Sequence, residues 1–242
     1  MEKEKGPRYL CPAVWLLAAT VGMVCVHFGE VVFGRGTYYL GDIARIYLPQ
    51  RAALVRAMAR RTLPWWTAGI GAGYPLLAEG EVAALYPPNW LMYGLMPAER
   101  ALSACIVLHY LLAGAGLFAY ARSLGLSRWS AYLGAIVFAL GGFNIAHLSH
   151  VSILSVVAWL PWMFFFTSEL LRGSPPSRAL PTLARALGLG LVVGMQFLAG
   201  HAQMSLMGLV ALAIYALYLG WARRTDRGGL RRWGVWLGAV FL

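Results

Sequence analysis

Long apolar runs constrain this chain more than any other feature of its sequence. A helix needs about 20 apolar residues to cross a hydrocarbon layer of roughly 30 Å. Six runs of this kind lie near 10–33, 101–121, 129–147, 151–171, 183–200 and 203–221. Hydrophobic residues make up 60% of the chain and charged residues 12%, against about 25% charged in soluble domains. We therefore predict an all-α polytopic membrane protein.

Both ends of the chain carry an apolar run that needs interpretation. The run at 10–33 is longer than the signal-peptide core of about 7–15 residues, and no small-x-small cleavage site follows it. We interpret it as a signal anchor rather than a cleaved signal peptide. A seventh run begins near Trp233 and is still apolar at Leu242. We therefore expect the sequence to be the N-terminal part of a longer transmembrane domain.

Positive charges between the runs predict the orientation, because Lys and Arg beside membrane helices favour the cytoplasmic side. The turns at 147–150 and 200–203 carry none, whereas the other connections and the start of the chain do. These flanking residues are Lys3, Lys5, Arg8, Arg122, Arg128, Arg172, Arg178, Arg185, Arg223, Arg224, Arg227, Arg231 and Arg232. We expect a cytoplasmic N-terminus, with 34–100 as a long first extracytoplasmic loop.

The net charge of +11 and the three cysteines exclude some other functions. The basic residues form no single face beside stacking aromatics, so nucleic acid is not expected as a partner. Cys11, Cys25 and Cys105 fall in or beside predicted helices without metal-ligand spacing, so we interpret them as packing residues.

The loop at 34–100 is long enough to be translocated whatever its charge, although it carries seven arginines. Within it, 49–61 has Ala53 and Leu54 opposing Arg56 and Arg60, which predicts an amphipathic helix lying at the membrane interface. Trp65, Trp66 and Trp90 are interpreted as interface anchors rather than sugar platforms. The glycines at 69–73 follow no predicted strand, so they do not indicate a phosphate cradle.

Polar residues from three separate segments are expected at the same outer membrane face. They are Asp42 in the loop, His147 and His150 in one turn, and His201 with Gln203 in another. Each histidine alone suits a hydrogen-bonded turn, and Asp42 alone suits a solvated or helix-capping position. Polar groups at the membrane are costly without partners, so their convergence favours a functional site there.

Ordered motifs along the chain carry a family resemblance. They include Tyr47-Leu48-Pro49 after Asp42, Leu63-Pro64-Trp65, Gly73-Tyr74-Pro75-Leu76, Leu85-Tyr86-Pro87-Pro88-Asn89, Gly142-Phe143-Asn144, Ala158-Trp159-Leu160-Pro161-Trp162 and Ala199-Gly200-His201-Ala202-Gln203. In this order and spacing the chain resembles the YfhO-type bacterial membrane proteins, which are similar to the GT-C glycosyltransferase superfamily. The resemblance implies a GT-C-like helix bundle in the bacterial cytoplasmic (inner) membrane.

The resemblance also implies a reaction, in which a sugar passes from a polyprenyl-phosphate donor to an extracytoplasmic glycan, lipid or protein acceptor. Asp42 matches the acidic residue that serves as base or acceptor-orienting group in that superfamily. Such a displacement also needs cationic or hydrogen-bonding groups on the departing phosphate. Arg45, Arg51 and His201 are candidates for that role, and Tyr47, Tyr86 and Asn89 for shaping the sugar pocket. We expect membrane lipids as further partners.

The sequence departs from the family pattern at some positions, and competing functions stay open. Trp65-Trp66-Thr67 stands where Trp-Asn often follows the Leu-Pro pair, and Glu79 and Glu81 stand where neutral polar groups are common. Glu81 would bind an amine acceptor or a metal, or pair with an arginine. No cofactor is predicted, with a divalent metal as the alternative. A transporter or flippase for a lipid-linked substrate is the main competing function, and a noncatalytic scaffold is the third.

Overall fold

A computed structural model describes residues 22–23, 26–31, 33–34, 36–39, 41–172, 179–222 and 229–241. Over these residues the secondary structure is helical, with one isolated backbone bridge between Thr67 and Tyr74 and no β-strand. The all-α class is therefore confirmed there. Most of the expected first helix at 10–33 lies outside the described residues, although 26–31 are helical.

Five helical stretches in the described part of the chain are long and apolar enough to cross a membrane, and each overlaps a run predicted above. They are formed by α4 (Ala98–Ser123), α5 with α6 (Arg128–Ala139 and Gly142–Ala146), α7 with α8 (Val151–Val157 and Leu160–Arg172), α9 (Ala179–Leu198) and α10 (Ala202–Ala222). Helix α11 (Gly229–Phe241) begins where the seventh run was expected.

Two of these stretches are interrupted for local reasons. Gly141 separates α5 from α6, and a β-carbon there would meet the carbonyl oxygen of Val137 at 2.6 Å. Pro161 lies at the start of α8, where its missing N–H removes a hydrogen bond that would have continued α7. Gly141 lies six residues before His147, whereas Pro161 lies eleven residues after His150, within the second stretch.

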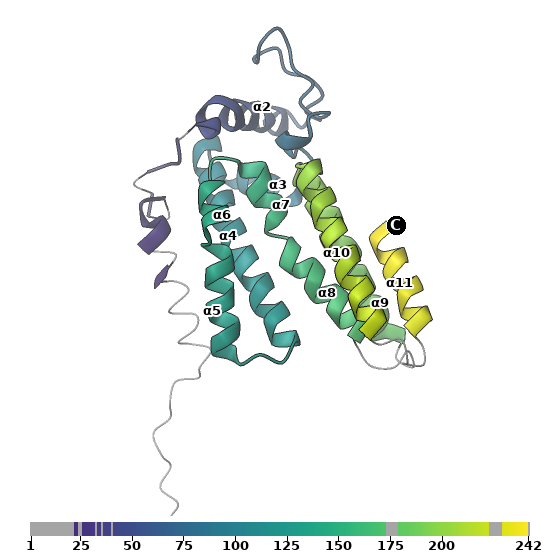
Figure 1. The fold of residues 1–242 in the computed structure, drawn as a ribbon. Helices are drawn as coiled ribbons and strands as arrows, with labels where there is room; N and C mark the ends of the chain where they lie inside the picture. The colour runs from purple at the N-terminus through teal and green to yellow at the C-terminus, as the bar shows by residue number, and fades with distance from the viewer. Residues whose placement is uncertain are drawn as a thin grey trace, which may run out of the picture.

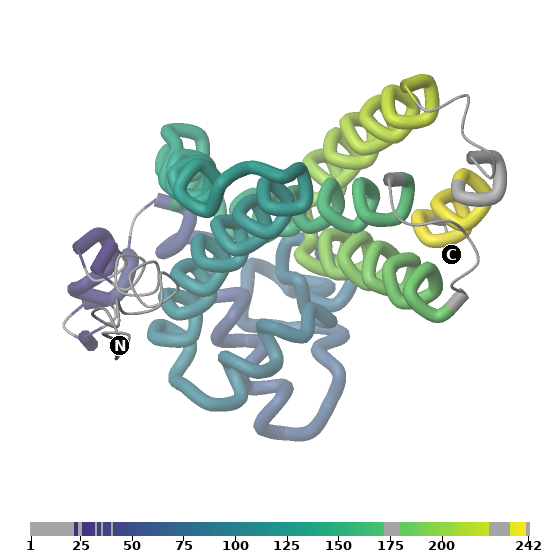
Figure 2. Tube along the Cα trace, turned by 90° about the horizontal axis from the view of Figure 1, so that it is seen from below, coloured from purple at the N-terminus to yellow at the C-terminus, as the bar shows by residue number. Residues whose placement is uncertain are grey.

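The membrane-length helices form two groups that meet at α8. Helix α4 packs against α5 and α8, with Ala113, Ala139 and Ala158 allowing close approach. Helix α8 packs in turn against α9, α10 and α11 around Met163, Leu189 and Leu212. Seen along the bundle in Figure 2, α8 lies between these two sides.

The loop that precedes α4 forms a cap on one end of the bundle. It contains η1 (Ile43–Tyr47), α2 (Leu48–Ala59), η2 (Gly80–Val82) and α3 (Pro87–Leu95). Helix α2 lies across the ends of the bundle helices (Figure 1). It covers most of the segment 49–61, and the interfacial position expected for that segment stays a prediction. Its buried face combines Gln50 and Arg51 with Ala53 and Leu54 and packs on α3 and α4. Its inner surface is thus a protein contact.

Tyr86, the residue before α3, attaches this helix to the bundle. The Tyr86 hydroxyl lies 2.8 Å from His109 Nε2 and accepts a hydrogen bond of 2.7 Å from Trp159 Nε1. His109 stands eleven residues inside α4, which corresponds to roughly 16 Å along its axis. Tyr86 is therefore inserted between α4 and the junction of α7 with α8, where it is only 1% exposed.

The substitution Tyr86→Phe is expected to destabilise the protein by about 1–3 kcal/mol, because it leaves buried ring nitrogens of His109 and Trp159 without this partner. Thermal unfolding in detergent measures the effect. Tyr39→Phe is the matched control, since Tyr39 is 68% exposed. Equal melting temperatures for the two variants would show that the Tyr86 hydroxyl does not hold α3 in place.

Candidate functional site

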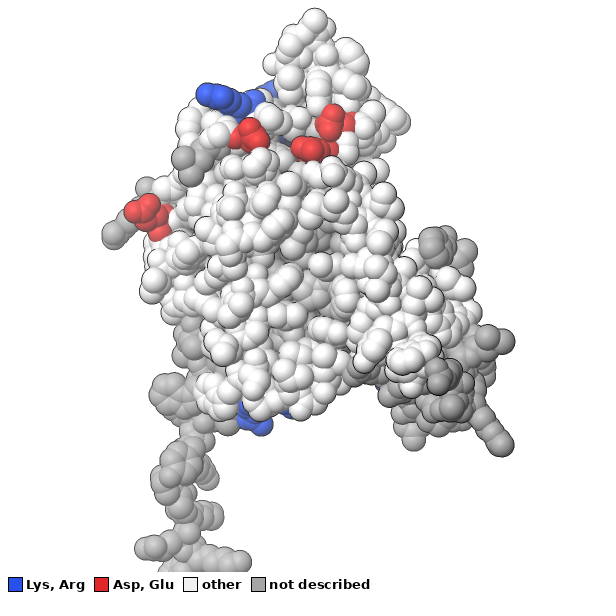
Figure 3. Space-filling model, viewed as in Figure 1, with Lys and Arg blue, Asp and Glu red and all other residues white. Residues whose placement is uncertain are grey.

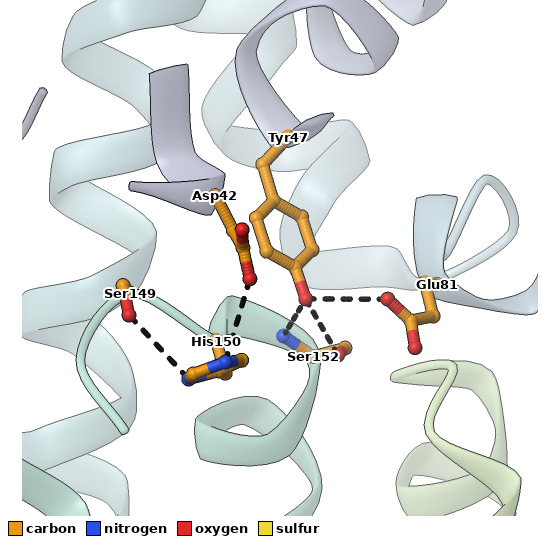
Figure 4. A network of polar contacts seen from close by, with 6 residues as sticks. All are labelled: Asp42, Tyr47, Glu81, Ser149, His150 and Ser152. Carbon is orange, nitrogen blue, oxygen red and sulfur yellow. Dashed lines mark hydrogen bonds and ion pairs between the residues drawn. The ribbon is translucent and has the colours of Figure 1, made fainter. Parts of the chain in front are cut away.

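Asp42 and His150 meet at the capped end of the bundle. Asp42 directly precedes η1, and His150 directly precedes α7. Asp42 Oδ2 lies 3.4 Å from His150 Nε2, and both side chains are a little over 40% exposed. On the other side of the ring, His150 Nδ1 lies 3.4 Å from Ser149 Oγ (Figure 4). The structure thus joins a carboxylate and an imidazole that the sequence placed in separate outer turns.

Backbone conformation brings Asp42 to this position. Gly41 has a φ of +48°, in the left-handed region that glycine adopts without strain, and η1 begins just after it. The ideal β-carbon of Gly41 would lie 4.0 Å from Ser149 Cβ, so the two turns touch at this point. The chain reversal at Gly41 therefore aligns the Asp42 side chain with His150.

Tyr47 connects α7, the helix that follows His150, to the η2 turn. Its hydroxyl lies 2.8 Å from Ser152 Oγ and donates a hydrogen bond of 3.3 Å to Glu81 Oε2 (Figure 4). Burial of the ring raises the pKa of Tyr47, and the negative charge of Glu81 adds to that rise. The phenol therefore stays protonated at neutral pH and can act as a hydrogen-bond donor.

Glu79 and Glu81 shape the η2 turn. Glu79 Oε1 accepts a hydrogen bond from the Glu81 backbone N–H, and Glu79 Oε2 accepts one of 2.8 Å from Tyr74. Burial and the bond to Glu79 raise the pKa of Tyr74 to about 12. Among the described residues neither glutamate forms an ion pair with an arginine. The pairing considered for Glu81 is absent there, because Arg51 contacts its backbone carbonyl instead.

Arg51 is the least expected member of the site. It is 2% exposed, and Nη2 donates a hydrogen bond of 3.3 Å to the Glu81 carbonyl. The guanidinium also lies 5.7 Å from the centre of the Tyr93 ring. Nε and Nη1 are buried without a hydrogen-bond acceptor. Burying a cation without a counter-charge costs several kcal/mol, so Arg51 is an unusual residue at this position.

Gln50 adds a second unsatisfied group from the same helix. Its Nε2 donates to the Tyr74 hydroxyl at 3.4 Å, while Oε1 is buried without a partner. Buried polar atoms are nearly always hydrogen-bonded in folded proteins. Helix α2 therefore presents two adjacent residues, Gln50 and Arg51, with hydrogen-bonding capacity left over.

The remaining predicted site residues fall into an outer and an inner set. Arg45 and Gln203 are exposed. His147 stacks on Phe143 at 4.2 Å between ring centres, and its ring lies 5.5 Å from that of His150. His201 accepts a hydrogen bond from the Met204 N–H and so caps α10.

Tyr86 and Asn89 belong to the inner set. Tyr86 is enclosed by His109 and Trp159, as described above. Asn89 is 3% exposed, and its amide nitrogen donates to the Ala83 carbonyl at 2.9 Å. Both side chains position α3 beneath the site, so the sugar pocket proposed for them is not open at these residues in this structure.

The η2 turn is locked to the second helix group by two glycines. A β-carbon on Gly200 would lie 2.0 Å from the Gly80 carbonyl oxygen, and one on Gly80 would lie 3.0 Å from the Gly200 carbonyl oxygen. Gly200 also has a φ of +102°. This contact fixes Glu81, and through it Arg51, against the turn between α9 and α10.

Comparison with known protein families, curated proteins and solved structures finds no match. The geometry of the chain itself is therefore the basis for its functional assignment. Within the described residues no group of three or more His, Cys, Asp or Glu side chains is placed to hold a metal ion.

Ser152 and Gln50 are the site residues that sequence reasoning missed. Ser152 looks like an ordinary small residue of an apolar helix, and only its spacing two residues after His150 could have drawn attention to it. Gln50 follows Pro49 in the first turn of α2, where a polar residue is unremarkable. Their roles depend on Tyr47 and Tyr74, which are contributed by other segments.

Proposed function

We propose that this chain is part of a membrane glycosyltransferase that moves a sugar from a polyprenyl-phosphate donor to an extracytoplasmic acceptor. One observation carries the proposal: a partly exposed carboxylate, Asp42, and a buried arginine without an anion, Arg51, belong to two sets of polar contacts that adjoin at the start of α7. The first set joins Asp42 to His150. The second runs from Ser152 through Tyr47 to Glu81, whose backbone carbonyl accepts a hydrogen bond from Arg51.

Asp42 and Arg51 have different roles in the displacement. Asp42 takes the proton from the acceptor hydroxyl, while the new C–O bond forms at the anomeric carbon of the sugar. The bond from that carbon to the phosphate oxygen breaks, and its electron pair leaves with the phosphate. Arg51 offers Nε and Nη1 to the departing phosphate, where negative charge increases.

The His150 ring holds Asp42 in place and keeps the carboxylate from turning into solvent. Tyr47 supports the same geometry through Ser152, which lies on the α7 turn that follows His150. Because Arg51 is 2% exposed, phosphate binding requires the η2 turn to move from α2. That movement breaks the 3.3 Å hydrogen bond from Arg51 and the packing of Val82 and Ala84 against Ala53 and Leu54 of α2.

The orientation proposed for this chain puts the site at the outer surface of the bacterial cytoplasmic membrane, with the N-terminus inside the cell. The turns that meet at the site carry no Lys or Arg, in keeping with the positive-inside rule. An outer site suits a donor whose polyprenyl chain stays in the outer leaflet.

Asp42→Asn is expected to lower transfer of labelled sugar from a polyprenyl-phosphate donor by about 10²–10⁴-fold at equal expression, because the amide cannot accept the proton. Membranes carrying the protein provide the assay, and Glu99→Gln is the control, since Glu99 is an exposed carboxylate on α4. The same assay with EDTA tests the metal-free mechanism.

Unchanged transfer by the Asp42 variant would remove this residue from the mechanism. No transfer by the unaltered protein would instead favour the transporter.

A further inference from the structure

A neutral arm projects from the outer loop beyond α2. It spans 62–75 and is closed by the backbone bridge between Thr67 and Tyr74, with hydrogen bonds of 2.9 and 2.8 Å. Arg61 turns the chain from α2 into the arm with a φ of +53°, an uncommon conformation for a residue other than glycine. Figure 1 shows the arm as the part of the molecule furthest from the bundle at this end.

Two adjacent tryptophans are held exposed on this arm. Trp65 is 66% exposed and Trp66 is 63% exposed. The Trp66 ring lies over Gly73, where a β-carbon would approach it to 2.3 Å, so the ring is supported from beneath by backbone. Large apolar side chains exposed side by side mark a binding surface, and a supported ring loses little conformational freedom on binding.

The segments that lead into the arm are positively charged, and Glu79 contacts Tyr74 at its closing end. From Ile43 to Ala78 the sequence has five arginines and no acidic residue. Arg56, Arg60 and Arg61 are exposed at the base of the arm. The Arg56 guanidinium reaches the arm itself, since its Nη2 would lie 3.7 Å from a β-carbon on Gly69. In Figure 3 the arm shows neither acidic nor basic side chains, and both blue and red atoms lie beside its base.

The direction of the arm argues against lipid as its ligand. The membrane-length helices end near 147–150 and 199–201, α2 lies across those ends, and the arm extends past α2 (Figure 1). A helix with its side chains is about 10–12 Å wide, which sets the arm above the helix ends. The exposed residues Trp90, Leu91 and Leu95 on α3 offer an apolar face nearer the bundle.

We propose that the arm binds an acidic sugar chain, with Trp65 and Trp66 stacking on the C–H faces of its rings. Arginine pairs with carboxylates through two parallel hydrogen bonds, which suits Arg56, Arg60 and Arg61 at the base of the arm. That this chain is the acceptor of the transfer rests on the proposed function. The binding surface itself rests on the arm alone.

The test uses the protein in phosphatidylcholine nanodiscs and fluorescein-labelled polygalacturonate as the probe. We expect saturable binding that weakens with salt, and no comparable binding of neutral dextran. Replacing Trp65 and Trp66 together by Ala is expected to weaken binding about tenfold, as is Arg60→Ala with Arg61→Ala. Trp129→Ala is the control, since Trp129 is 60% exposed on α5. Melting temperatures establish that the variants are folded.

Absence of polygalacturonate binding, or equal binding by the double tryptophan variant, would overturn the inference. Brominated lipids provide a second measurement, because they quench tryptophans that enter the bilayer. Quenching that disappears in the double variant would make the arm a lipid anchor. Binding that persists in Asp42→Asn while transfer is lost agrees with both proposals. Arm-dependent binding by a protein that transfers no sugar contradicts the proposed function alone.

Discussion

Arg51→Met should abolish transfer, with a loss of at least about 100-fold, and leave the protein as stable as before or more so. The guanidinium is buried, and only one of its three nitrogens has a hydrogen-bond acceptor. Replacing a buried charge by an apolar side chain of similar size is often neutral or stabilising. Loss of activity together with unchanged or higher stability indicates that a residue serves ligand binding rather than the fold.

Transfer assays on membranes and thermal unfolding in detergent give the two readouts for Arg51→Met. Arg100→Met is the control, because Arg100 is an exposed arginine in the first turn of α4. It should change neither activity nor melting temperature. A fall of several kcal/mol in the stability of the Arg51 variant would show that the Tyr93 and Glu81 contacts make Arg51 a structural residue.

Gly200→Ala is expected to destabilise the protein by about 3 kcal/mol and to reduce transfer strongly. The new methyl group would collide with the Gly80 carbonyl oxygen, and the φ of +102° adds backbone strain. The collision pushes η2 away from the α9–α10 turn and displaces Glu81, which holds both Tyr47 and Arg51.

Gly194→Ala is the matched control for that substitution, because Gly194 lies on the same helix pair and has nothing within 4 Å of its ideal β-carbon. Because alanine has a higher helix propensity than glycine, we expect Gly194→Ala to be neutral or mildly stabilising. The comparison uses melting temperatures in one detergent. A Gly200 variant as stable as the Gly194 variant would mean that η2 is not anchored at this contact.

The membrane-length helices could be predicted from sequence because their pattern is local. An apolar run of about 20 residues requires no knowledge of its neighbours. The breaks at Gly141 and Pro161 were harder to place, since glycine and proline also occur inside membrane helices without interrupting them. The position of α2 was predicted from Pro49 and the pattern that follows, but its buried polar face was not.

The candidate site could be predicted only in part, because its contacts join distant segments. Charge asymmetry placed Asp42 and His150 on one face, and the structure brings their side chains to 3.4 Å. No local signal distinguishes the buried Arg51 from the exposed Arg45 and Arg56. Tyr86 and Asn89 resembled pocket residues in sequence, whereas α3 carries them into the interior.

The contact between Gly80 and Gly200 sets an order for biosynthesis. The η2 turn is made about 120 residues before the turn that receives it. At about 5–20 residues per second, the ribosome needs roughly ten seconds to supply that partner. The contact that holds η2 against the α9–α10 turn therefore forms only after that turn has been made.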